Sequence, residues 1–135
     1  MAYLIGIVLA LAVSAYATAL ELDRDRAFYP TLLIVIAAYY VLFAAMGGSG
    51  RVMIVELLVA AVFVVAASLG FRRSLWLVVV ALAAHGVQDF FHARLVANPG
   101  VPAWWPAFCG TYDVVAAGYL AWRLTRHQVR PVPGA

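Results

Sequence analysis

A run of chemically active side chains lies between residues 85 and 92, inside a stretch that is otherwise apolar. His85, Asp89 and His92 are spaced by four and then three residues, with Gln88 beside them. A helix places the first three on one face, within roughly 60° of arc. Ionisable groups inside a membrane segment are costly and usually mark a functional site. The spacing therefore predicts a polar stripe on a membrane helix.

Two further carboxylates in apolar segments could meet this stripe. Glu56 lies about one turn into the segment 51–70, and Asp113 lies near the middle of the segment 103–124. Only a short connection separates the stripe's own segment from 103–124, so the two segments are expected to be antiparallel neighbours. We therefore expect His85 and Asp113 to pair, because a carboxylate commonly fixes the tautomer of an imidazole in this way.

These residue types predict a metal site. Histidine and carboxylate ligands suit zinc, iron, manganese or copper, and helix bundles hold such ions between facing helices. The predicted ligands of this divalent ion are His85, Asp89, His92, Glu56 and Asp113. The two histidines are about 10 Å apart along a helix axis, too far for one ion to bind both directly. Asp89 and His92 are the favoured chelating pair, completed by Glu56, with His85 and Asp113 supporting them or forming a second site.

The same residues are compatible with other functions. Buried carboxylates and histidines are the usual parts of a proton- or ion-coupled transporter. They could instead be a buried polar network in a structural or accessory subunit of a larger membrane complex, although such contacts average only about 0.6 kcal/mol. A metal-activated water could also hydrolyse a lipid, with Asp113 or Glu56 as the general base. The pattern leaves open whether there is an enzymatic reaction.

Composition sets the class of protein and excludes some chemistry. Of the 135 residues, 67% are hydrophobic and only 11% are charged, against about 25% charged in soluble domains, so we expect an integral membrane protein. Every basic residue is arginine, and without lysine no Schiff base to retinal or pyridoxal phosphate can form. The single cysteine, Cys109, allows no internal disulfide. Together with Met46 and Met53 it could favour copper(I), but such residues in apolar helices are more often packing.

The apolar segments predict an all-α bundle of five transmembrane helices. Their expected ranges are 2–20, 28–46, 51–70, 75–96 and 103–124, forming one domain over 1–124, followed by a basic, proline-containing tail over 125–135. Glycine, proline and charged residues separate the segments. The first connection contains the run ELDRDRAFYP, which we expect to be a solvated turn with local ion pairs, or else a contact patch for a partner.

The arginines predict an orientation. Seven lie at the ends that include the carboxyl terminus and two at the opposite ends, and basic residues accumulate on the cytoplasmic side. We therefore expect the amino terminus outside, the carboxyl terminus in the cytoplasm, and the site in the outer half of a bacterial-type inner membrane. The expected partners are the lipid bilayer and a membrane protein or a second copy of the chain, with no nucleic acid. We expect one of Tyr39, Tyr40 and Tyr112 to line the cavity.

Overall fold

The computed structural model describes residues 1–47 and 50–129, and this part of the chain is helical without any strand. Its helices are α1 (Ala2–Ala19), α2 (Phe28–Met46), α3 (Gly50–Arg72), α4 (Leu75–Leu95) and α5 (Trp105–Thr125). Each begins and ends within two residues of the range expected from the sequence. The predicted all-α bundle is confirmed.

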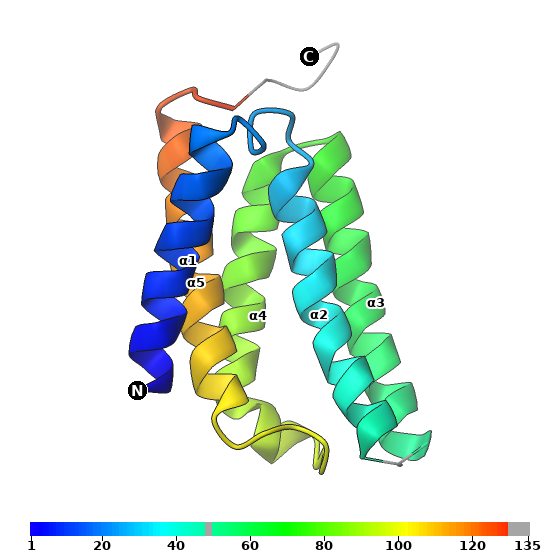
Figure 1. Cartoon of the computed structure of the whole chain (residues 1–135). Coiled ribbons are helices and arrows are strands. Elements are labelled where there is room, and N and C mark those ends of the chain that lie inside the picture. The colour runs from blue at the N-terminus through cyan, green and yellow to red at the C-terminus, as the bar shows by residue number, and fades with distance from the viewer. Residues whose placement is uncertain (48–49, 130–135) are drawn as a thin grey trace.

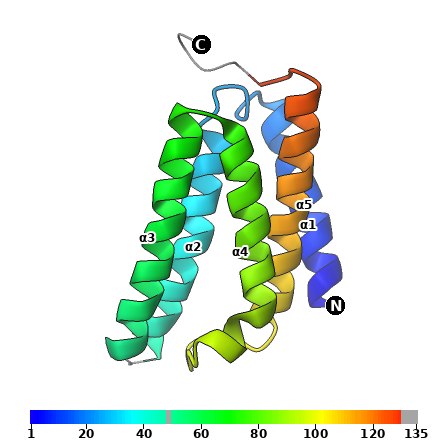
Figure 2. The same ribbon diagram turned by 180° about the vertical axis from the view of Figure 1, so that it is seen from behind.

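Four of the helices, α1 to α4, are long and apolar enough to cross a membrane. The fifth, α5, does not belong to this set, because tryptophan, proline, glycine and tyrosine dilute its apolar residues. It nevertheless runs beside α1 and α4 along the bundle (Figures 1 and 2). Five membrane crossings therefore stay a prediction that depends on α5.

Helix α4, which carries the polar stripe, has the most neighbours in the bundle. It packs against α5 and α3 and also contacts α2, while α1 packs on the far side of α5 (Figure 1). Ser74 caps its amino end, where the side chain accepts a hydrogen bond from the backbone of Trp76 at 3.4 Å. The packing places the stripe in the interior of the bundle.

Two glycines set the distance between α4 and α5. A Cβ atom on Gly86 would lie 2.7 Å from the carbonyl oxygen of Gly110, and one on Gly110 would lie 2.9 Å from the carbonyl oxygen of Gly86. Small residues of this kind allow close approach of membrane helices. The residues that directly precede these glycines, His85 and Cys109, are thereby brought close together across the interface.

The two ends of the bundle differ in charge. The Met1 end holds the amino terminus, the end of α2, the start of α3 and the α4–α5 loop, and the Arg123 end holds the α1–α2 and α3–α4 connections and the end of α5 (Figure 1). The arginines at the Arg123 end are Arg24, Arg26, Arg72, Arg73, Arg123 and Arg126, and those at the Met1 end are Arg51 and Arg94. Arg130, the seventh arginine of the predicted cytoplasmic set, lies outside the described residues.

The connection between α1 and α2 is ordered by specific contacts. Arg24 and Glu21 make the expected local ion pair at 2.6 Å. Asp23, however, is 1% exposed and pairs with Arg123 of α5, with Nε 3.1 Å from Oδ2. Arg26 donates to the carbonyl of Phe71 at 3.0 Å. The expected solvated turn with a local ion pair is present at Glu21 and Arg24, but Asp23 departs from it, since a buried charge pair ties this loop to α5.

Candidate metal centre

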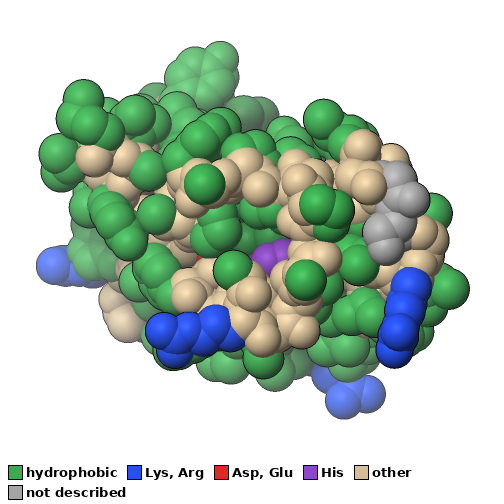
Figure 3. All heavy atoms as spheres, turned by 90° about the horizontal axis from the view of Figure 1, so that it is seen from below, with side chains coloured by type: hydrophobic (Ala, Val, Ile, Leu, Met, Phe, Trp, Pro, Cys, Tyr) green, Lys and Arg blue, Asp and Glu red, His purple; other side chains and the backbone are tan. Residues whose placement is uncertain are grey.

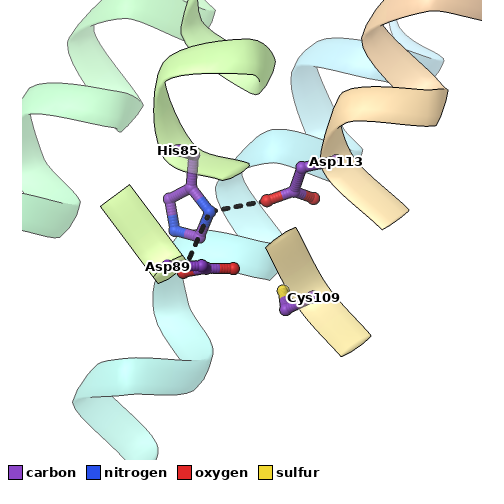
Figure 4. Close-up of side chains that lie close together, drawn as sticks. All are labelled: His85, Asp89, Cys109 and Asp113. Carbon is purple, nitrogen blue, oxygen red and sulfur yellow. Dashed lines mark hydrogen bonds and ion pairs between the residues drawn. The ribbon is translucent and has the colours of Figure 1, made fainter. Parts of the chain in front are cut away.

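Four metal-ligating side chains meet where α4 and α5 approach each other. His85 and Asp89 come from α4, and Cys109 and Asp113 come from α5 (Figure 4). One potential ligand atom from each lies within 4.8 Å of the others, and all four residues are buried. We call these residues the inner cluster. A group of this kind could hold a metal ion.

His85 is oriented by both carboxylates of the inner cluster. Its Nδ1 lies 2.7 Å from Oδ2 of Asp113 and 3.8 Å from Oδ1 of Asp89 (Figure 4). Because a carboxylate only accepts, the Nδ1–H group donates to Asp113. The pair expected from the sequence is present. The ring of Phe63 packs edge-on against the imidazole, with 4.7 Å between ring centroids.

Asp89 is the least satisfied polar group of the inner cluster. Its side chain is fully buried, and neither carboxylate oxygen has a hydrogen-bond partner among residues 1–47 and 50–129. The Cys109 thiol lies in the same cluster, and the Tyr40 hydroxyl is likewise buried without a hydrogen-bond partner among the described residues. A buried carboxylate without a compensating donor or charge is strongly unfavourable. The surroundings of Asp89 therefore suit a bound cation.

The dimensions of the inner cluster fit a small ion after a modest contraction. Zinc binds nitrogen, oxygen and sulfur at about 2.0–2.3 Å, so adjacent ligands of a tetrahedral site are about 3.3–3.8 Å apart. The four ligand atoms lie up to 4.8 Å apart, which means that binding would draw them inward by about 1 Å. The two carboxylates and the Cys109 thiolate would together outweigh the charge of a divalent ion, which favours its retention, and the ion would replace the proton between His85 and Asp113.

His92 and Glu56 lie outside the inner cluster and form a separate group. Nε2 of His92 is 2.8 Å from Oε1 of Glu56. The side chain of Asn98 donates to the same oxygen at 2.9 Å and to the backbone carbonyl of Tyr40 at 3.2 Å. We call Glu56 and His92 the outer pair.

The geometry does not support the expected chelating set, which was Asp89, His92 and Glu56. Among the residues described, no hydrogen bond or ion pair joins Asp89 to His92. The imidazole of His92 turns instead toward α3, and its ring stacks on Tyr40 with 4.0 Å between centroids. Asp89 consequently groups with His85. The five predicted residues divide into the inner cluster, which gains Cys109, and the outer pair.

Three residues near these groups were missed or left open by sequence reasoning. Cys109 lies four residues before Asp113 and so on the same face, a signal that could have added it to the ligand set. Asn98 in the α4–α5 loop and Tyr40 gave no comparable signal. Met46 is 71% exposed and does not join Cys109 in a sulfur site.

Comparison with protein-family models, with curated proteins and with solved structures finds no match to this chain. The functional argument therefore depends on the geometry of the inner cluster and the outer pair.

Proposed function

We propose that this chain is an integral membrane protein that binds one divalent metal ion at the inner cluster of His85, Asp89, Cys109 and Asp113. The observation that carries the proposal is the buried Asp89 carboxylate, which has no hydrogen-bond partner on either oxygen in the part of the chain that the structure describes. Three other potential ligands lie next to it. A cation at their centre would supply the missing partner and neutralise the charge.

The donor types favour zinc as the first ion to test. One thiol, one imidazole and two carboxylates form a mixed sulfur, nitrogen and oxygen set. Such sets suit zinc, with iron, manganese and copper as further candidates, whereas calcium and magnesium prefer oxygen alone. Under this proposal the outer pair does not contribute direct ligands to the retained ion.

The proposed location is a bacterial-type inner membrane, with the Met1 end outside. The concentration of arginine at the Arg123 end supports this orientation. The inner cluster then lies in the membrane interior, and the outer pair lies nearer the external surface.

Transport of an ion or a proton across the membrane is supported less well. Polar side chains continue from the inner cluster toward the Met1 end, where the outer pair lies. Toward the Arg123 end, the buried faces of α4 and α5 continue as Leu82, Val78, Ala116, Ala117 and Leu120. An apolar layer of this kind opposes the passage of charge, so the arrangement favours binding from one side.

An enzymatic role would use the remaining free oxygens. Oδ1 of Asp113 and Oε2 of Glu56 are both buried without a hydrogen-bond partner, and these carboxylates remain the candidates for a general base. Metal binding does not depend on this role.

The test is elemental analysis of protein purified in mild detergent without chelator. We expect about one ion per chain in the wild type, because four convergent donors suffice for a closed site. The ion should be lost from Asp89→Asn and His85→Ala, but kept by the matched controls Glu21→Gln and His127→Ala, whose side chains lie at the surface. A wild type that holds no ion, even after incubation with each candidate metal, would contradict the proposal and favour an accessory subunit.

A further inference from the structure

The outer pair has an unused acceptor. Oε1 of Glu56 accepts hydrogen bonds from both His92 and Asn98, whereas Oε2 accepts none although the residue is 1% exposed. Nε2 of His92 faces this carboxylate at 2.8 Å, so a cation that binds here would take the place of the shared proton and contact both side chains. The outer pair therefore offers one carboxylate oxygen and one imidazole nitrogen to a further ligand.

A pocket at the Met1 end reaches His92 of this pair. It has a volume of about 450 Å³, and His92 and Asn98 lie among its lining residues, together with residues of the α4–α5 loop. In the view onto this end, a histidine side chain is visible at the bottom of a hollow (Figure 3). Space of this size admits an ion that retains several water molecules.

Tyr40 lies between the outer pair and the inner cluster. Its ring stacks on His92 at 4.0 Å and lies 6.0 Å from the ring of His85. An ion that moves from the pocket to the inner cluster must pass this side chain.

We propose that Glu56 and His92 form a second, weaker binding site for a divalent cation, which loads the inner cluster from the Met1 end past Tyr40. This loading site rests on the proposed function of the inner cluster. Its affinity is lower because the protein supplies two donors instead of four, and water from the pocket completes the coordination. Removal of the charge of Glu56 slows loading, and removal of the Tyr40 ring opens the path.

The experiment measures the rate at which metal-free protein in detergent takes up Zn²⁺, and the rate at which loaded protein releases it to a chelator. Glu56→Gln should load about tenfold more slowly, because the negative charge beside His92 attracts the incoming cation and charges of this kind raise association rates. The equilibrium stoichiometry should stay at one ion per chain. His92→Gln, a second variant that keeps Glu56, should also slow loading.

Tyr40→Ala should raise both the loading and the release rates about tenfold, equivalent to a barrier lowered by about 1.4 kcal/mol. The dissociation constant should change little, because both directions accelerate together. Matched controls are Tyr39→Ala, the neighbouring tyrosine on α2 that is 38% exposed, and His127→Gln at the protein surface. Both controls should load at the wild-type rate.

The outcomes separate this inference from the proposed function. If the wild type binds no Zn²⁺, the proposed function fails and the loading site fails with it. If the wild type binds Zn²⁺ but Glu56→Gln, His92→Gln and Tyr40→Ala load and release at wild-type rates, the loading site is wrong and the inner cluster stands. If Glu56→Gln abolishes equilibrium binding, Glu56 is a ligand of the retained ion, and the two-site inference is overturned.

Discussion

At the scale of single residues, the two aspartates of the inner cluster have different surroundings. Asp113 accepts the Nδ1–H of His85 at 2.7 Å, whereas Asp89 has no hydrogen-bond donor on either oxygen. The buried Asp89 carboxylate destabilises the metal-free fold, because burial removes the water around its charge and no hydrogen-bond donor takes the place of that water. Asp89 therefore links metal binding to stability more directly than its neighbours do.

The variant Asp89→Asn separates these two effects. We expect the metal-free variant to be at least as stable as the metal-free wild type, because an uncompensated buried charge is gone. The wild type should gain about 2.7 kcal/mol when free Zn²⁺ is a hundredfold above its dissociation constant, and the variant should gain none. Thermal unfolding in detergent with and without Zn²⁺ measures both. A zinc-dependent shift retained by the variant would be inconsistent with Asp89 as a ligand.

The Asp23–Arg123 pair allows a second prediction at this scale. Arg123→Met leaves the buried Asp23 carboxylate without its cation, so we expect a loss of about 3–5 kcal/mol in the free energy of unfolding. The double variant Asp23→Asn/Arg123→Met should recover much of this loss. Arg24→Met removes the exposed pair with Glu21 and should change the stability by less than about 0.5 kcal/mol. Denaturant unfolding in mixed micelles gives all three values, and equal losses in the two single arginine variants would refute the distinction.

At the scale of the elements, the contact between α4 and α5 positions the inner cluster. Each helix supplies two of its four residues, and the glycine pair at this interface lets the backbones approach closely. A shift of one helix along the other would displace both of its ligands from the two ligands on the other helix, and the four side chains would no longer surround one ion. Asn98 lies in the loop that joins α4 to α5. Its side chain donates hydrogen bonds to Glu56 of α3 and to the backbone carbonyl of Tyr40 in α2, and so holds these two helices against the loop.

Substitution of these glycines tests the importance of the contact. Gly86→Ala places a Cβ atom 2.7 Å from a backbone carbonyl oxygen, so the helices must move apart at a cost of about 1–3 kcal/mol. We expect weaker Zn²⁺ binding in the same variant. Gly118→Ala on α5 is the control, because its Cβ would meet nothing within 4 Å, and it should be neutral or stabilising by up to about 1 kcal/mol. Equal effects of the two variants on zinc affinity would show that helix separation does not matter.

At the scale of the whole molecule, the fold could be predicted further than the site. Apolar runs separated by glycine, proline and charged residues specify helix bounds to within two residues. They also specify that α4 and α5 are antiparallel neighbours, which was enough to predict the pairing of His85 with Asp113.

The division of the polar residues into two groups could not be predicted in this way. It depends on how far α3 is rotated about its axis and on the way Asn98 folds back onto Glu56. Neither feature leaves a periodic signal in the sequence. As a result, the spacing predicts Glu56 and His92 as ligands together with Asp89, and it does not decide whether Cys109 is a ligand or a packing residue.

Orientation and the number of membrane crossings are the predictions that belong to this scale. In a Cys109→Ala background, we expect Trp104→Cys to react with a membrane-impermeant maleimide on intact cells, because its position is exposed at the Met1 end. Arg126→Cys, at the other end of α5, should react only after permeabilisation. The reverse pattern would contradict the proposed orientation, and reaction of both variants from the same side would contradict a membrane-spanning α5.

The most direct test of the central claim is X-ray absorption at the zinc edge of the zinc-loaded protein. If the inner cluster holds the ion, the first shell contains one sulfur at about 2.3 Å and nitrogen or oxygen atoms at about 2.0–2.2 Å. The sulfur should disappear in Cys109→Ser, because Cys109 is the single cysteine of the chain. A wild-type shell of nitrogen and oxygen alone, or a sulfur that persists in Cys109→Ser, would show that the ion binds elsewhere.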